Sequence, residues 1–166
     1  MSFEKYEKYP IVENFKREWA DKQITQAPIY CSVDLRDGNQ ALINPLTIEQ
    51  KLEYFKVLVK MGFKQIEVSY PSASDTDFNF TRKLIEENIV PDDVAIQILI
   101  PAKKEWIKRS VEAMRGVKNG IFHLYNPTNE FQRRVVFQKN DDEIVNMAVE
   151  AMKYLIKETK DFEGNV

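Results

Sequence analysis

Two kinds of apolar pattern alternate along the chain from residue 29 onward. Short runs rich in β-branched residues, typical of buried strands, occupy residues 29–35, 65–70, 94–100 and 120–125. Between them lie longer stretches in which apolar residues recur every three or four positions, the spacing of one face of an α-helix. This alternation of strands and helices predicts βαβ units and a parallel sheet.

Each predicted helix begins at polar residues suited to its first turn. Thr47 and Gln50 precede one apolar stripe and fit a capping box. Asn140 and Glu143 precede another stripe and fit a helix cap. Gly116 fits the stop of a third helix, because glycine tolerates the left-handed conformation found there. The expected helix starts are Thr47, Ser74 or Asp75, about Lys103, and Asn140.

The number of βα units sets the expected fold. A complete (β/α)8 barrel takes about 250 residues, whereas this chain has 166. We therefore expect residues 29–166 to form the first four βα units of a TIM barrel, a truncated half-barrel, with a fifth strand beginning near residues 161–166. An open four-stranded α/β sheet is the alternative that periodicity leaves open. Residues 1–28, with aromatic residues among charges, are expected to be an N-terminal arm that packs on this domain.

The composition narrows the functional classes. The formal net charge of −2 gives no general attraction to nucleic acid or to an anionic membrane. No apolar stretch approaches the ~18 residues of a membrane span, and the first 19 residues lack the apolar segment of a secretory signal. The single cysteine, Cys31, cannot form an internal disulfide and suits a reducing compartment, so we expect a cytoplasmic protein.

A polar residue interrupts each predicted strand at a similar place in the repeat. Strands of a parallel sheet usually read as continuous apolar runs, so four exceptions at intervals of about 30 residues suggest one shared pocket at the carboxyl ends of the strands. Structural explanations stay open beside this one: Glu67 could pair with Arg36 or a lysine, because glutamate is rarely buried unpaired. Likewise, Gln97 could simply hold its neighbours by hydrogen bonds, and His123 could be a satisfied core histidine. The four interrupting residues are Asp34, Glu67, Gln97 and His123.

The most informative segment is Val-Asp-Leu-Arg-Asp-Gly-Asn-Gln at residues 33–40. It places two acids and a guanidinium at the end of the first predicted strand, where α/β folds usually have their active or ligand-binding sites. Unpaired charge is costly to bury. These residues therefore form either a functional site or a surface turn in which Gly38 supplies a positive φ.

The segment at residues 126–139 is long for a connection between a strand and a helix. Long loops at the carboxyl ends of barrel strands often carry function. Arg133 and Arg134 lie in this loop and could meet a carboxylate or a phosphate. A place on the solvated surface is the alternative for at least one of them.

The motif at residues 33–40 resembles the first strand of the enzymes that condense an acyl-CoA with a 2-oxo acid in a metal-dependent reaction. Further segments are similar to the α-isopropylmalate synthases in particular, and the similarity covers nearly the whole chain. Pro-Ser-Ala-Ser-Asp-Thr-Asp-Phe at residues 71–78 separates this branch from the homocitrate-type enzymes. Citramalate and homocitrate synthases are the sibling alternatives. The similar segments are residues 28–42, 62–68, 71–78, 123–128 and 133–137.

The resemblance implies a TIM-barrel transferase that holds a divalent cation. Its reaction condenses acetyl-CoA with 3-methyl-2-oxobutanoate to 2-isopropylmalate and CoA, the first step of leucine biosynthesis. Asp37 would be the carboxylate ligand of Mg²⁺ or Mn²⁺, with Zn²⁺ also suitable. Arg36 and Glu67 would be catalytic, Arg36 by stabilising the alkoxide that forms at the attacked carbonyl. The residues expected to bind substrate are His123, Gln40 and Tyr125.

The chain departs from this family in its histidines. The other metal ligands of the family are a His-x-His pair on a later strand, whereas this chain has one histidine. We therefore expect it to be the N-terminal segment of a homo-oligomeric enzyme and to be inactive alone. The alternative is a non-catalytic half-barrel that self-associates through its open sheet edges, since two halves could close one barrel.

Overall fold

The computed structural model describes residues 25–166, which form a four-stranded parallel sheet with a helix after each strand. The strands lie side by side in chain order, β1-β2-β3-β4. Doubly wound open sheets reverse their strand order at a switch point, whereas a barrel adds strands in sequence. The order therefore favours the half-barrel over the open sheet. The strands are β1 (Cys31–Ser32), β2 (Gln65–Ser69), β3 (Ala95–Pro101) and β4 (Gly120–Tyr125).

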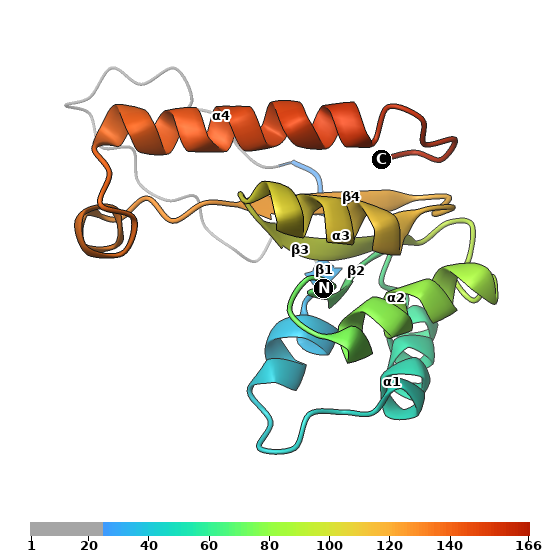
Figure 1. Cartoon of the computed structure of the whole chain (residues 1–166). Coiled ribbons are helices and arrows are strands. Elements are labelled where there is room, and N and C mark those ends of the chain that lie inside the picture. Colours follow the sequence, from blue (N-terminus) through green and yellow to red (C-terminus); the bar gives the residue numbers. More distant parts are fainter. Residues whose placement is uncertain (1–24) are drawn as a thin grey trace.

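The helices begin where their capping residues predicted. Thr47 and Gln50 exchange both hydrogen bonds of a capping box, as do Asn140 and Glu143, and the Ser74 side chain accepts from the backbone of its own helix. Gly116 follows the third helix with φ +83°, the left-handed conformation expected of it. The helices are α1 (Ile48–Met61), α2 (Asp75–Glu86), α3 (Lys104–Met114) and α4 (Asp141–Glu158), labelled in Figure 1.

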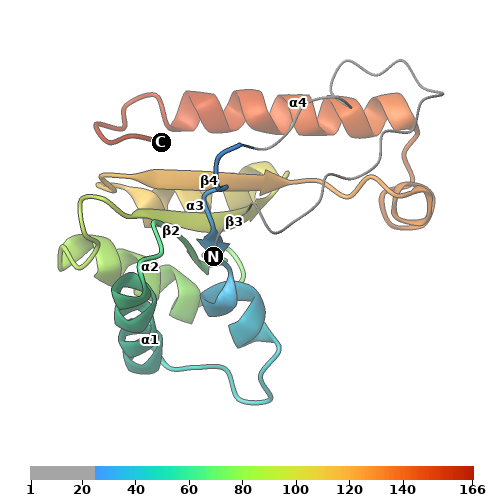
Figure 2. The same ribbon diagram turned by 180° about the vertical axis from the view of Figure 1, so that it is seen from behind.

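The two faces of the sheet have different environments. Along β3, Ile96, Ile98 and Ile100 have no exposed surface and belong to the core beneath the helices, while Gln97 and Leu99 between them are partly exposed. Figure 1 shows α3 in front of β3 and β4, and the reverse view in Figure 2 shows β4 in front of α3. In the described part of the chain, the helices thus cover one face, and the other face corresponds to the interior of a barrel.

β1 is shorter than the predicted strand at residues 29–35. Only Cys31–Ser32 pairs with β2, and the chain then enters a π-helical turn, η2 (Asp34–Gly38). The backbone N–H groups of Arg36 and Asp37 donate to the Val33 carbonyl at 3.2 and 2.8 Å and begin this turn. Leu35 has no exposed surface. The apolar pattern there therefore reflects a buried residue of a turn rather than a longer strand.

The last residues of the chain lie beside β4, where a fifth strand was expected. Asn165 forms a parallel bridge with Asn119 beside β4, as a beginning fifth strand would. The loop after β4 contains a second π-helical turn, η3 (Gln132–Phe137). The greater part of the predicted N-terminal arm, residues 1–24, lies outside the described residues. Among residues 25–166, no helix combines the length and the hydropathy that crossing a bilayer requires.

Candidate active site

Glu67 lies at the centre of the candidate site. It sits on β2 and has no exposed surface, yet its two carboxylate oxygens receive three side-chain donors. Arg36 Nε donates to Oε1. Gln97 Nε2 donates to Oε2, and His123 Nδ1 lies 2.7 Å from the same oxygen. A single buried acid on β2 thus joins one residue of β3, one residue of β4 and one residue of the turn after β1.

The register of the parallel sheet explains this convergence. Glu67 lies opposite Gln97, and Gln97 lies opposite Ile121 on β4. His123 is two residues beyond Ile121, so it points to the same face, because side chains alternate along a strand. The predicted meeting of these polar residues is therefore confirmed for Glu67, Gln97 and His123.

Asp34 is the exception, and the expectation that it joins the pocket is wrong. Its side chain is exposed and accepts a hydrogen bond from the Ser32 hydroxyl at 2.8 Å. The cause is the end of β1 at Ser32. Beyond that residue the chain no longer alternates with a period of two, and η2 instead brings Arg36 to Glu67.

The residues around Glu67 stabilise the ionised form of its carboxyl group. Burial acts to raise the pKa of its carboxyl, but the hydrogen bonds from His123, Gln97 and Arg36 and the charge of Arg36 outweigh burial and lower that pKa below its usual range. Glu67 is therefore a carboxylate at neutral pH, paired with a guanidinium. The ion pair between Glu67 and Arg36 that the sequence allowed is present.

Asp37 and Gln40 extend the network toward solvent. Arg36 Nη1 contacts Asp37 Oδ1, and Gln40 Nε2 donates to the same oxygen at 3.1 Å. The Asp37 side chain is 45% exposed, compared with 13% for that of Arg36. Arg36 is therefore held between a buried and an open carboxylate, and Asp37 is the acid that a ligand can approach.

Tyr125 ends β4 and lies close to Tyr70, which follows β2 directly. Burial, together with the neighbouring Tyr125, raises the pKa of the Tyr70 hydroxyl. The Trp106 ring of α3 lies 5.9 Å from that of Tyr70. Tyr70 and Trp106 were not singled out from the sequence, although the position of Tyr70 at the end of the strand predicted at residues 65–70 was a usable signal.

The two arginines of the long loop have separate surroundings. Arg133 pairs with Asp141 in the first turn of α4, and its side chain is largely buried. Arg134 is exposed and pairs with Glu130 at 3.0 Å, one helical turn before it. Arg134 thus lies on the solvated surface, which was the alternative expected for at least one of the two arginines. Arg133 connects the loop to α4 through its ion pair.

The donor set bears on the expected metal ion. In the part of the chain that the structure describes, no three His, Cys, Asp or Glu side chains are grouped so that they could hold a metal. Asp37 offers one accessible carboxylate beside Arg36. These residues could supply one ligand to a metal centre but do not form a closed centre themselves.

Comparison with known proteins gives consistent matches. Residues 27–166 match the family described as HMGL-like. The chain is 52% identical to the 2-isopropylmalate synthase of Clostridium acetobutylicum over 95% of the chain and 28% of that protein. The corresponding enzyme of Corynebacterium efficiens is 53% identical over 88% of the chain and 25% of its own length. That of Helicobacter hepaticus is 47% identical over 99% of the chain and 30% of its own length. The chain thus spans less than a third of these relatives and corresponds to their N-terminal part.

Proposed function

Because this chain belongs to the HMGL-like family, we propose that it is the N-terminal part of a 2-isopropylmalate synthase. That enzyme would join the methyl carbon of acetyl-CoA to the 2-oxo carbon of 3-methyl-2-oxobutanoate, and water would then cleave the thioester to release CoA. The observation that carries the proposal is the network of Arg36, Glu67 and His123 at one edge of the sheet. It occurs in a chain about half identical to proteins of that name.

Arg36 is the residue proposed to act on the reacting carbonyl. Attack on that carbonyl turns its oxygen into an alkoxide, and a fixed cation near the oxygen lowers the barrier. The guanidinium is fixed because Glu67 engages Nε and Asp37 contacts Nη1. Its remaining N–H groups could meet the developing charge without rearrangement.

Glu67 was expected to be catalytic, and its contacts favour a specific form of that role. Both of its oxygens are occupied by donors within the protein. We therefore propose that Glu67 acts as a positioning residue that orients Arg36 and His123. The Nδ1–H of His123 points at Glu67, which in the neutral ring leaves Nε2 as an acceptor for a substrate hydroxyl or water.

Asp37 is proposed as one metal ligand of the complete enzyme. HMGL-like enzymes usually use a divalent metal, which when bound would polarise the 2-oxo group. A hard carboxylate oxygen suits Mg²⁺ or Mn²⁺ and also accepts Zn²⁺. Further ligands would come from the part of the longer relatives to which this chain does not correspond. His123, Gln40 and Tyr125 are proposed to line the substrate side of the pocket.

A chimera tests the proposed activity. This chain would replace the matching N-terminal segment of the Clostridium acetobutylicum relative, and a thiol reagent would monitor CoA release from acetyl-CoA. We expect release that depends on 3-methyl-2-oxobutanoate and on added divalent metal. A chimera that instead requires pyruvate or 2-oxoglutarate would assign the chain to a citramalate or homocitrate synthase.

An Asp37→Ala chimera tests the ligand assignment. Loss of one carboxylate should weaken binding of Mn²⁺ at least about tenfold, because few ligands hold the ion. Asp34→Ala is the matched control, since Asp34 is an exposed acid in the same turn that contacts only its neighbour Ser32 among the described hydrogen bonds. Equal Mn²⁺ affinity in the Asp37→Ala and parent chimeras would show the assignment to be wrong.

A further inference from the structure

His123 presents to the pocket the part of its ring that Glu67 does not contact. Its Nδ1 lies 2.7 Å from Glu67 Oε2, and the Glu67 side chain has no exposed surface. The His123 side chain is nevertheless 45% exposed. The exposed part of the ring therefore lies on the side away from Glu67, and that side carries the second nitrogen, Nε2.

The contacts of His123 fix which of its nitrogens carries the hydrogen. A carboxylate only accepts hydrogen bonds, so the contact with Glu67 requires a hydrogen on Nδ1. Gln97 Nε2 lies 3.4 Å from the same Nδ1 and donates to the same oxygen of Glu67. The ring and the amide are thus two donors that share one acceptor. The neutral ring of His123 keeps its free lone pair on Nε2.

Gln97 supplies a second acceptor beside this nitrogen. Its amide nitrogen donates to Glu67, so its carbonyl oxygen Oε1 is turned away from that carboxylate. Among residues 25–166, the side-chain contacts of Gln97 run through its nitrogen and leave Oε1 without a donor. β3 and β4 are neighbours, and both side chains lie on the face of the sheet that the helices leave open. The pocket therefore holds two adjacent acceptors, His123 Nε2 and Gln97 Oε1.

Two adjacent acceptors suit a ligand that donates two hydrogen bonds. A water molecule has two such hydrogens, and when both are held its lone pairs are free to attack a carbonyl carbon. The methyl group and the carbonyl groups that take part in the condensation have no O–H or N–H donor. Water enters the proposed reaction only afterwards, when it cleaves the thioester. The pair of acceptors therefore fits the hydrolytic step better than the condensation.

Building on the proposed function, we propose that His123 is the general base of thioester hydrolysis and that Gln97 orients the attacking water. The water gives one proton to His123 Nε2 while its oxygen bonds to the thioester carbonyl carbon. The C–S bond then breaks, and the thiolate of CoA takes the proton from Nε2 as it leaves. Water and thioester thus become a carboxylic acid and a thiol, with no oxidant, reductant or further reactant. A positioned base of this kind typically contributes a factor of about 100 or more to the rate.

The buried carboxylate supports this role of His123. Proton transfer turns the ring into an imidazolium whose Nδ1–H still faces Glu67. Hydrogen bonds and the charge of Arg36 keep Glu67 ionised, so it stabilises the cation and holds the ring in one orientation, as the buried acid of a Ser-His-Asp triad does. Arg36 contacts the other oxygen of Glu67. One carboxylate thus positions Arg36 for the condensation and His123 for the hydrolysis.

The experiment separates the two steps in the chimera. Enzyme in excess over radiolabelled acetyl-CoA is mixed with 3-methyl-2-oxobutanoate and divalent metal and is quenched with acid at intervals. Chromatography then quantifies acetyl-CoA, the condensed CoA thioester and the free hydroxy acid. In His123→Asn, acetyl-CoA should disappear at the parent rate, but the condensed thioester should accumulate because its hydrolysis slows at least about 100-fold. Gln97→Met removes the second acceptor with little change in size and should slow the same step about tenfold.

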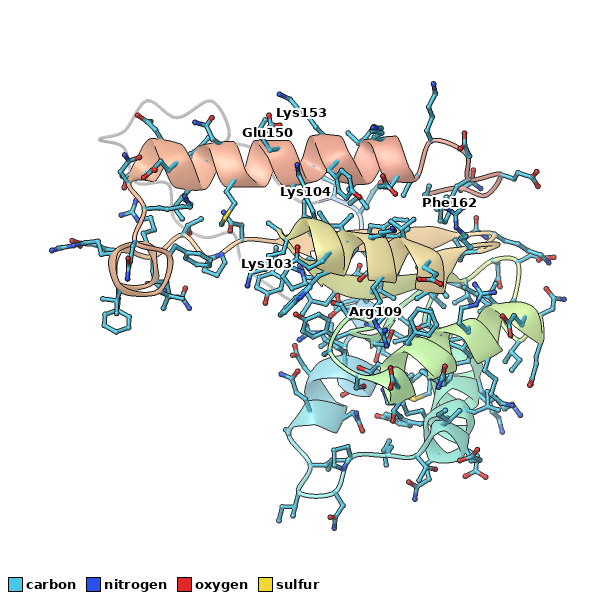
Figure 3. The ribbon with its side chains drawn as sticks, in the orientation of Figure 1. Lys103, Lys104, Arg109, Glu150, Lys153 and Phe162 are labelled. Atoms are coloured by element: carbon cyan, nitrogen blue, oxygen red, sulfur yellow. The ribbon has the colours of Figure 1, made fainter. Side chains whose placement is uncertain are left out.

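Two further variants serve as comparisons. Arg36→Lys should slow the disappearance of acetyl-CoA without accumulation of the condensed thioester, because Arg36 is assigned to the condensation. Lys153→Gln is the control and should match the parent in both steps. Lys153 pairs with Glu150 at 2.8 Å on the outer side of α4, away from the sheet, as Figure 3 shows.

The outcomes distinguish this inference from the proposed function. A parent chimera that consumes no acetyl-CoA would contradict the proposed function and the inference with it. With an active parent, release of CoA at the parent rate by both His123→Asn and Gln97→Met would overturn the inference alone. So would loss of acetyl-CoA consumption in a His123→Asn chimera that unfolds as the parent does, since His123 would then act in the condensation. If His123→Asn fails to fold, Gln97→Met decides by the same measurements.

Discussion

At the scale of single residues, Glu67 shows how a buried acid can organise a site. Its carboxylate is removed from solvent but receives donors from Arg36, Gln97 and His123. Hydrogen bonds to a charged acceptor are among the stronger polar contacts, and loss of the shared acceptor leaves each of its donors without that contact. Substitution of Glu67 should therefore reduce the stability of the fold by removing the hydrogen bonds of all three of these residues.

Glu67→Gln should lower the free energy of unfolding by roughly 3 kcal/mol at neutral pH, because it leaves Arg36 without its buried partner. Folding lowers the pKa of Glu67, so the folded state binds fewer protons than the unfolded state. The stabilisation is complete above the ordinary carboxyl range and is lost as the pH falls through the lowered pKa. The difference between parent and variant, from urea unfolding at pH 7 and at about pH 4, should therefore shrink at the lower pH.

Glu150→Gln is the matched control for this measurement. Glu150 also pairs with a cation, Lys153 at 2.8 Å, but on the exposed side of α4, where such pairs contribute little. We expect its unfolding curve to follow that of the parent at both pH values. A Glu67→Gln deficit of the same size at pH 7 and pH 4 would contradict the assigned charge state.

The second prediction at this scale concerns Arg36. In the chimera, Arg36→Lys should lower kcat about 100-fold with little change in KM, because a lysine cannot reproduce two directed N–H contacts and still face the developing alkoxide. The measurement is a substrate titration of CoA release. Arg134→Lys, an exposed arginine in the long loop, should be kinetically silent. An Arg36→Lys chimera that raises KM but keeps kcat would show that Arg36 binds substrate without acting on the reacting carbonyl.

At the scale of secondary-structure elements, a buried ion pair joins α1 to α2. Lys51 has no exposed surface, and its ammonium pairs with Asp77 and lies 5.2 Å from the Phe80 ring. Asp77 also accepts from the Tyr70 backbone N–H at 3.0 Å. One contact network therefore fixes the end of β2, the start of α2 and the first turn of α1.

Lys51→Met should destabilise the chain by roughly 3 kcal/mol, because Asp77 keeps a charge without its partner. The double variant with Asp77→Asn should lose less than the sum of the two single changes, since it leaves no unpaired charge. A double-mutant cycle by urea unfolding measures this coupling. Lys56→Met, an exposed lysine on the same helix, is the control. Additive losses would indicate that the pair contributes nothing beyond its separate side chains.

The start of a helix could be predicted from the sequence more reliably than the end of β1. Thr47 and Asn140 mark helix starts because their caps depend on residues three positions away. The end of β1 at Ser32 was not predictable, since the turn at Asp34–Gly38 is fixed by where Leu35 is buried and where Arg36 finds Glu67. The alternation of side chains along a strand correctly placed Glu67, Gln97 and His123 on one face of the sheet. The same rule predicted the wrong position for Asp34, because the strand ends before that residue.

At the scale of the whole molecule, strand order decides what periodicity could not. Both the half-barrel and the open sheet predict four strands and four helices, and only the arrangement β1-β2-β3-β4 separates them. The contact of Tyr70 with Trp106 was equally hidden, because it depends on how α3 lies across the end of β2. The DxRDGNQ motif (residues 34–40), in contrast, identified the candidate site from residues that are neighbours in the chain.

The final prediction follows from the number of candidate ligands. The 166-residue chain alone should release no measurable CoA from acetyl-CoA and 3-methyl-2-oxobutanoate, with or without Mg²⁺ or Mn²⁺. Its described residues place Asp37 beside Arg36 but do not group three candidate ligands, and a divalent ion bound by one carboxylate and water is held weakly. A thiol-trapping assay beside the active chimera makes the comparison. Robust metal-dependent turnover by the chain as a monomer would mean that the site is complete within these residues, and that the dependence on a longer enzyme is wrong.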